Sequence, residues 1–188
     1  DRCGGGILLS QHTRATIANC TITHNYARNG GGLACLEQAT PSISNTLITR
    51  NRATGRGGGI YARNASPRIK NSRIEGNEGR IGGGISCIAG AHATIQDCLI
   101  GGNQAKSGGG GIAVSGSHPA LHACFISGNM AGQGGGMYLR FNTSPTVSHC
   151  VLSGNSATDG GAIFAQSMAN PKIVNCVIDA NEANFGGG

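Results

Sequence analysis

One asparagine recurs every 26 residues along this chain, and nothing interrupts its period. Its copies are Asn25, Asn51, Asn77, Asn103, Asn129, Asn155 and Asn181. An aliphatic residue precedes each copy by three residues, and a second one precedes it by eight. A fixed period of about 20 to 50 residues is typical of solenoids, in which each repeat packs only on its neighbours. The sequence therefore predicts a repeat architecture rather than one built on an aromatic core.

Each repeat contains three short apolar segments separated by turn residues. In the repeat that starts at Gly134, these segments are residues 137–139, 146–148 and 150–152. Helices are disfavoured because no apolar set has helical spacing and because each glycine costs a helix about 1 kcal/mol. The predicted fold is all-β: a parallel β-solenoid of about seven coils, each with 26 residues and three short strands. Residues 1–188 then form a single domain.

The columns, meaning the equivalent residues of successive coils, have structural explanations. An asparagine tolerates the left-handed conformation of a tight corner, and stacked amides donate to one another as in cross-β ladders. Glycine pairs one period apart, such as residues 31–32 and 57–58, indicate a second sharp corner. An extra glycine, at Gly59 and at Gly111, delays the next aliphatic residue. This delay predicts a β-bulge or a one-residue loop exchange in those two coils.

The chain resembles right-handed parallel β-helix repeat proteins. Ile126, Asn129 and Ala131, followed by glycines and Met137, give a pattern similar to the F-x-x-N and G-G-A-I repeats of polymorphic outer-membrane proteins. Ile replaces the Phe, and residues 160–163 match the second motif most closely. The resemblance, which extends to autotransporter passengers, implies a right-handed, single-stranded β-helix. Such β-helices serve as adhesin passengers, surface stalks and polysaccharide-cleaving enzymes, so it indicates fold more than function.

Both ends of the chain lie at the same phase of the repeat, because residues 4–6 and 186–188 are glycine runs. Neither end shows the capping repeat that shields an open solenoid core. We expect the chain to be a fragment or repeat region of a longer chain, with stacking on other copies as the alternative. No run of 18 apolar residues exists, so no transmembrane segment is predicted.

Five of the eight cysteines share one column: Cys20, Cys98, Cys124, Cys150 and Cys176. Their spacing matches no zinc motif, and stacked parallel Cβ vectors rarely give disulfide geometry. We expect reduced thiols that point inward and behave as small hydrophobic groups. A metal-binding row of thiolates is the alternative.

The net charge of +6 is unevenly spread, since residues 1–80 hold eleven of the fourteen Lys and Arg residues. The densest group is Arg50, Arg52, Arg56, Arg63, Arg68, Lys70, Arg73 and Arg80. A solvated surface explains such a group without any ligand, whereas a patch for an acidic glycan or another polyanion is the functional hypothesis. Nucleic acid is not expected as a partner, because no aromatic residues interleave to stack bases.

No catalytic residue and no cofactor is predicted. The eight carboxylates do not share columns in adjacent repeats, and the Asp cluster that the resemblance would imply for a lyase is missing. His92 and His118 share a turn column, but two ligands without a third make only a weak metal candidate.

The preferred function is a non-catalytic structural or adhesive rod, secreted or displayed at the cell surface. Its copies would stack end to end into a fibre, or it would join other domains of the same chain. The alternatives are a polysaccharide-processing enzyme and a module that binds acidic glycans. An enzyme would need at least two carboxylates within reach of a basic residue in an elongated groove.

Overall fold

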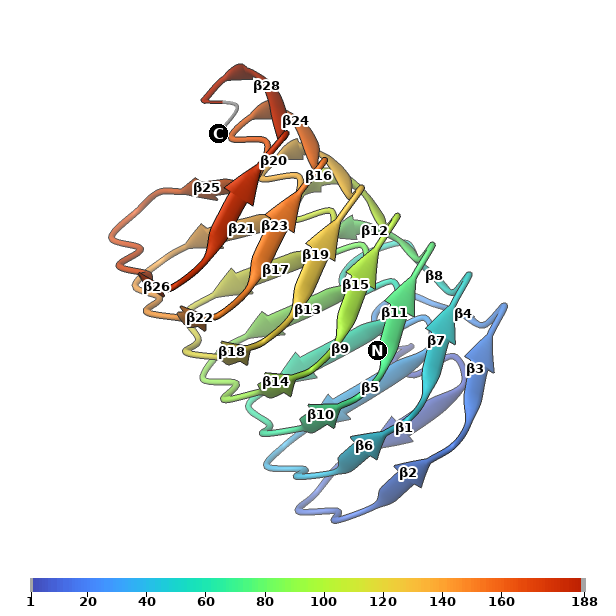
Figure 1. The fold of residues 1–188 in the computed structure, drawn as a ribbon. Coiled ribbons are helices and arrows are strands. Elements are labelled where there is room, and N and C mark those ends of the chain that lie inside the picture. The colour runs from blue at the N-terminus through green and yellow to red at the C-terminus, as the bar shows by residue number, and fades with distance from the viewer. Residues whose placement is uncertain (1, 187–188) are drawn as a thin grey trace.

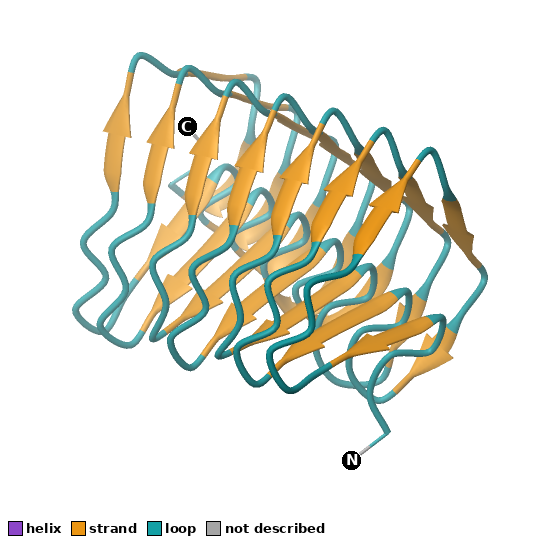
Figure 2. Ribbon diagram, turned by 90° about the horizontal axis from the view of Figure 1, so that it is seen from below, coloured by secondary structure: helices purple, strands orange, loops and turns teal. Residues whose placement is uncertain are grey.

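The computed structural model describes residues 2–186, which form a rod of seven stacked coils (Figure 1). Every coil contributes one strand to each of four parallel sheets, and each sheet contains seven strands. Figure 2 shows the strands joined only by loops and tight corners. Among the described residues no helix exists that could span a membrane. The predicted all-β parallel solenoid with a period of 26 residues is confirmed.

Two sheets lead from the glycine corner to the cysteine column. The first sheet comprises β1 (Ile7–Leu9), β5 (Leu33–Leu36), β9 (Ile60–Arg63), β13 (Ile85–Ile88), β17 (Ile112–Ser115), β21 (Met137–Arg140) and β25 (Ile163–Ala165). The second sheet comprises β2 (Thr16–Ala18), β6 (Ser42–Ser44), β10 (Arg68–Lys70), β14 (Thr94–Gln96), β18 (Ala120–His122), β22 (Thr146–Ser148) and β26 (Lys172–Val174).

The other two sheets flank the asparagine column. The third sheet comprises β3 (Thr21–Thr23), β7 (Leu47–Thr49), β11 (Arg73–Glu75), β15 (Leu99–Gly101), β19 (Phe125–Ser127), β23 (Val151–Ser153) and β27 (Val177–Asp179). The fourth comprises β4 (Tyr26–Ala27), β8 (Arg52–Ala53), β12 (Glu78–Ile81), β16 (Gln104–Gly108), β20 (Met130–Gln133), β24 (Ser156–Asp159) and β28 (Glu182–Phe185).

The fourth sheet corrects the prediction of three strands per coil. Its strands follow the ladder asparagine directly, and two of them, β4 and β8, contain only two residues. Small residues pair along it on the buried side, as Ala27 does with Ala53 and Gly79 with Ala105. A strand whose inward side chain is alanine or glycine lacks the large aliphatic residue by which alternation is recognised. The sequence pattern therefore misses this strand.

The core consists of stacked aliphatic columns. The second-sheet column runs through Ile43, Ile69 and Ile95, and the third-sheet column through Ile74 and Ile100, each paired with its equivalent in the next coil. Ile95 and Ile100 are 0% exposed. In the last described coil, the equivalent Ile173 and Ile178 are each 40% exposed. Each coil therefore completes the burial of its neighbour, and burying one such side chain stabilises the fold by about 1.5–3 kcal/mol.

The asparagine side chains form a buried hydrogen-bonded ladder, as predicted. Asn103 Nδ2 donates to the carbonyl oxygen of Ile74 at 2.8 Å and to Asn129 Oδ1 at 3.0 Å. Asn103 Oδ1 accepts from the backbone N–H of Asn77 at 2.9 Å and from its Nδ2 at 3.0 Å. Each amide thus satisfies backbone groups at the corner and links its coil to both neighbours.

The predicted left-handed conformation belongs to the residue before the ladder asparagine, not to the asparagine itself. That residue has positive φ in every coil, for example 53° at Arg50 and 59° at Gly102. The bend at this position turns the following side chain inward, where its amide reaches the next coil. The asparagine is selected for its hydrogen bonds rather than for its backbone conformation.

Glycine is favoured at all three positions of the glycine corner for two physical reasons, although Ala162 takes the third position in one coil. Gly82 has a φ of 69°, a conformation that side chains disfavour. A Cβ on Gly83 would lie 2.4 Å from the backbone oxygen of Gln104 in the next coil. A Cβ on Gly84 would lie 3.1 Å from Asn103 Nδ2. The corner therefore depends on close approach to both the fourth sheet and the ladder.

The predicted glycine register is wrong in two coils. Gly58 and Gly59, rather than residues 57–58, stack on Gly31 and Gly32. The inserted residue lies earlier, between the pairs Arg52–Glu78 and Arg56–Ile81 in one coil. A register shift within β16 marks the other insertion. Both insertions are β-bulges at the end of the fourth strand. The glycine run that follows contains no extra residue and is only displaced by one position. Gly187 and Gly188, predicted to end the glycine columns, lie outside the described residues, as does Asp1.

We expect Asn103→Ala to destabilise the protein by about 2 kcal/mol or more, because it removes the bonds of Asn103 to both neighbouring coils and leaves the backbone N–H of Asn77 buried and unpaired. Urea denaturation followed by circular dichroism measures the loss. The exposed neighbour Gln104 provides the control, since Gln104→Ala should change stability by less than about 0.5 kcal/mol. Equal losses in the two variants would contradict the ladder's role.

Candidate functional site

The eight basic residues predicted to form one patch lie on different faces of the rod. Arg63 lies on the first sheet, Arg68 and Lys70 on the second, Arg73 on the third, and Arg52 and Arg80 on the fourth, while Arg50 and Arg56 lie in the connections beside the fourth sheet. A solenoid wraps every 26 residues around its whole circumference, so charges that are dense in sequence are dispersed in space. Arg52, Arg56 and Arg80 remain grouped near the fourth sheet, and Arg68 and Lys70 lie together on the second.

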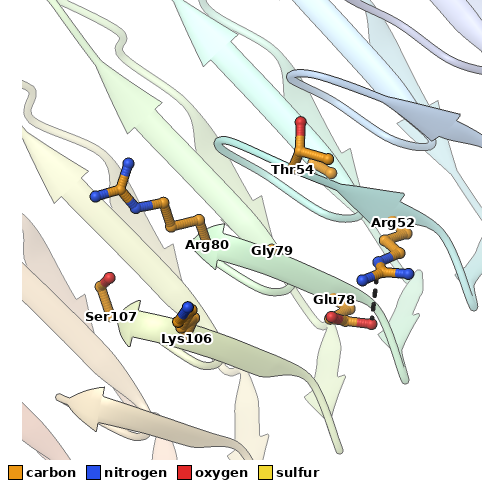
Figure 3. Close-up of a pocket in the computed structure, with 8 residues that line it drawn as sticks. Arg52, Thr54, Glu78, Gly79, Arg80, Lys106 and Ser107 are labelled. Carbon is orange, nitrogen blue, oxygen red and sulfur yellow. Dashed lines mark ion pairs between the residues drawn. The ribbon is translucent and has the colours of Figure 1, made fainter.

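A groove of about 400 Å³ crosses β8, β12 and β16 on the outer surface of the fourth sheet (Figure 3). Its charged lining residues are Arg52, Glu78, Arg80 and Lys106. They come from three consecutive coils, because equivalent positions of parallel strands lie side by side. The parallel ladder therefore arranges the charges in rows along the rod.

The groove is positively charged, with three cations against one carboxylate. Arg52 Nε lies 3.4 Å from Glu78 Oε2, and both side chains are more than half exposed (62% and 54%). Such an exposed pair contributes about 0–1 kcal/mol and leaves both groups accessible. Arg80 and Lys106 form no ion pair with a carboxylate of residues 2–186. The groove thus offers two uncompensated cations to an anionic ligand.

Lys106 is the groove residue that the sequence analysis missed. It lies in the part of the chain that is poor in basic residues, so local charge density gave no signal. The 26-residue period does indicate that Lys106 belongs to a row of basic residues. The members of that row share one repeat position: Arg2, Arg28, Arg80 and Lys106. Charge summed by column, rather than along the chain, predicts this surface.

The cysteine column points inward, and all eight cysteines are free thiols. Cys124 donates its backbone N–H to Cys150 Sγ at 3.4 Å, and Cys20, at the first coil, is exposed. Burial raises the pKa of Cys35 and of Cys87, which lie on the first sheet outside this column, to about 12, whereas a hydrogen bond with Cys124 lowers the pKa of Cys98 within the column. The protonated, buried thiols of Cys35 and Cys87 are poor metal ligands and poor nucleophiles. Among residues 2–186, no three His, Cys, Asp or Glu side chains cluster as a metal site would require.

The two histidines considered as metal ligands stack on each other. Their ring centroids lie 5.6 Å apart, and His118 Nδ1 accepts the backbone N–H of Ser144 at 3.1 Å. This hydrogen bond occupies one nitrogen of His118. Within the described part of the chain, His92 and His118 have no third ligand.

The carboxylates are separated from one another. Glu75 pairs with Arg73 at 3.0 Å on the third sheet, whereas Glu78 pairs with Arg52 on the fourth. Asp159 accepts from Gln133 Nε2 at 3.1 Å. Within residues 2–186, no two carboxylates occupy the same column in adjacent coils. Among the described residues that line the groove, Glu78 is thus the single carboxylate, with no second one to act with it as an acid or base.

Comparison with known proteins supports the fold. A family model described as "Right handed beta helix region" matches residues 1–129 and, in a second alignment, residues 59–188. The two matches together span the whole chain. No curated protein and no solved structure matches the chain. The predicted right-handed β-helix is therefore confirmed at the level of fold.

We expect iodoacetamide to alkylate Cys20 readily in the native protein at pH 9 and to leave Cys35 and Cys87 unmodified. A pKa of about 12 leaves about one buried thiol in a thousand ionised at that pH. Peptide mass spectrometry measures the extent of modification. Unfolding in guanidinium should make all cysteines reactive, and native labelling of Cys87 at the rate of Cys20 would refute the buried thiol arrangement.

Proposed function

We propose that this chain, which belongs to the right-handed β-helix family, is a non-catalytic adhesive rod that binds an acidic glycan along its fourth sheet. The observation that carries the proposal is the groove in which Arg80 and Lys106 face solvent without a carboxylate partner among residues 2–186. The rod positions the groove, and the groove supplies the binding chemistry.

The rod-like role is supported by the way the coils are joined. Sheet pairing and the asparagine ladder link every coil to the next along the described chain. Buried amides that are fully hydrogen-bonded make such a contact specific in register as well as stable. A stack of this kind resists bending and holds surface groups at fixed spacing.

The glycan-binding role is supported by the spacing and chemistry of the groove. Arg80 and Lys106 belong to consecutive coils, which lie about 4.8 Å apart along the rod. An extended polyanion that lies along the sheet meets these cations in succession. No aromatic side chain lines the groove, so it lacks a platform on which nucleic acid bases would stack.

The separation of the carboxylates favours this proposal over a polysaccharide-processing enzyme. Glycoside hydrolysis needs two carboxyl groups about 5–9.5 Å apart on either side of the scissile bond. The groove contains Glu78 alone, and its carboxylate pairs with Arg52. Release of reducing ends from an acidic polysaccharide by the purified protein would instead support the enzyme.

Secretion or display at the cell surface is part of the proposal and rests on the resemblance of the repeats to adhesin passengers. Contact with other copies of the chain, or with other domains of a longer chain, likewise stays a prediction.

We expect the double variant Arg52→Gln/Lys106→Gln to bind a sulfated glycosaminoglycan about tenfold more weakly than the wild type. Surface plasmon resonance at low ionic strength measures the affinity. The control is Arg68→Gln/Lys70→Gln, which removes the same charge from the second sheet and should change affinity by less than about twofold. Equal losses in both variants would indicate attraction to net charge alone and refute the groove as the site.

A further inference from the structure

A second pocket, of about 260 Å³, lies beside the groove, over the outer face of the first sheet. We call it the Arg56 pocket; its polar lining residues are Arg28, Asn29, Arg56, Tyr61 and Arg80. Arg80 also lines the fourth-sheet groove, so the two concavities adjoin. Among the described residues that line this pocket, none is a carboxylate, and Arg56 and Arg80 bring positive charge to it.

The β-bulge before the glycine corner places Arg56 in this pocket. The extra residue gives Arg56 the column position that Asn29 holds in the preceding coil and Ile81 in the next. Asn29 Oδ1 accepts the backbone N–H of Arg56 at 3.0 Å, which fixes the backbone there. The backbone from which the Arg56 side chain enters the pocket is therefore fixed by a specific hydrogen bond.

The positive charge of the Arg56 guanidinium has little compensation from its surroundings. Its Nη1 exposes less than 1 Å² and has no hydrogen-bond partner among the described residues. Burial lowers the pKa of Arg56, and the nearby charges of Arg140 and Arg80 lower it further, against an opposing effect of Tyr61. Neither Arg56, Arg80 nor Arg140 forms an ion pair with a carboxylate of residues 2–186. A half-buried guanidinium with one buried, unused N–H donor beside like charges is stabilised when an anion binds to it.

We propose that the Arg56 pocket binds one tetrahedral oxyanion, a sulfate or phosphate ester group carried by the acidic glycan that the fourth sheet is proposed to bind. Guanidinium groups donate paired N–H groups to such oxygens with good geometry. Arginines that converge from different coils suit a tetrahedral group, whose oxygens point in several directions, better than a planar carboxylate. The fourth-sheet groove would hold the chain, and the pocket would select for the ester group.

Calorimetric titration with inorganic sulfate, inorganic phosphate and acetate, at constant ionic strength in chloride, tests the pocket without any glycan. We expect saturable binding of sulfate or phosphate and weaker binding of acetate. The stronger of the first two anions identifies the ester. Absence of saturable binding by both tetrahedral anions would overturn the proposal.

Arg56→Gln should weaken binding of the tetrahedral anion about tenfold or more, because it removes a charged donor. Arg68→Gln, on the exposed face of the second sheet, is the matched control and should bind as the wild type does. In chloride alone, Arg56→Gln should melt no lower than the wild type, since it removes a half-buried charge that has no counter-ion among residues 2–186. Unchanged anion affinity in Arg56→Gln would refute the site. If that variant does not fold, Arg80→Gln, which lines the same pocket, should still weaken anion binding by about threefold.

A glycan arm separates this inference from the proposed function. Arg56→Gln should lose affinity for a sulfated or phosphorylated glycan but retain that for a glycan whose only acids are carboxylates. Anion binding that depends on Arg56, without any glycan binding, would uphold the pocket and refute the proposed function. Glycan binding that depends on Arg52 and Lys106 but not on Arg56 would uphold the function and refute the pocket.

Discussion

The contact between one asparagine amide and the next sets the geometry of the whole rod. Asn103 is hydrogen-bonded at both its nitrogen and its oxygen, so the distance and the register between coils are specified together. This contact leaves little room on the adjacent corner, where a Cβ on Gly84 would lie 3.1 Å from Asn103 Nδ2, and Ala162 is the largest residue found in that column. The aliphatic columns then stack in register and supply most of the stabilisation. Specificity and stability thus come from different residues.

The period made most of the fold predictable. The columns through Ile95 and Ile100, and the ladder through Asn103, lie where the repeat places them, because a parallel stack converts sequence period directly into contact. The fourth strand was missed because alanine inside and polar residues outside give it almost no pattern. In two coils the sequence shows that the first aliphatic residue comes one position late, but not whether the extra residue lies before or within the glycine run. The predicted register of the glycines was therefore wrong in those coils.

The candidate site was less predictable than the fold, since outward positions carry no information about packing. Arg73 and Arg80 are close in sequence but lie on different sheets, whereas Arg80 and Lys106 are a full coil apart and line one groove. The pocket around Arg56 combines it with Asn29, Tyr61 and Arg80 from neighbouring coils, a grouping that no local pattern indicates. Side chains on a solenoid surface are therefore best compared along the rod axis, as the structure arranges them.

The two β-bulges shift the residues around the glycine corner by one position but leave the columns of the second and third sheets in register. In an ordinary strand, one inserted residue moves every later side chain to the opposite face. Here the shift passes through the glycine corner and the first strand, where Leu33 pairs with Ile60, and a shorter turn before the second sheet cancels it, so that Ile69 and Leu121 return to their columns. An insertion before the corner and a matching deletion after the first strand thus bring a new side chain over the first sheet while the second and third sheets keep their register. Two compensating length changes within one turn let such a scaffold acquire a surface residue without displacing the columns that follow.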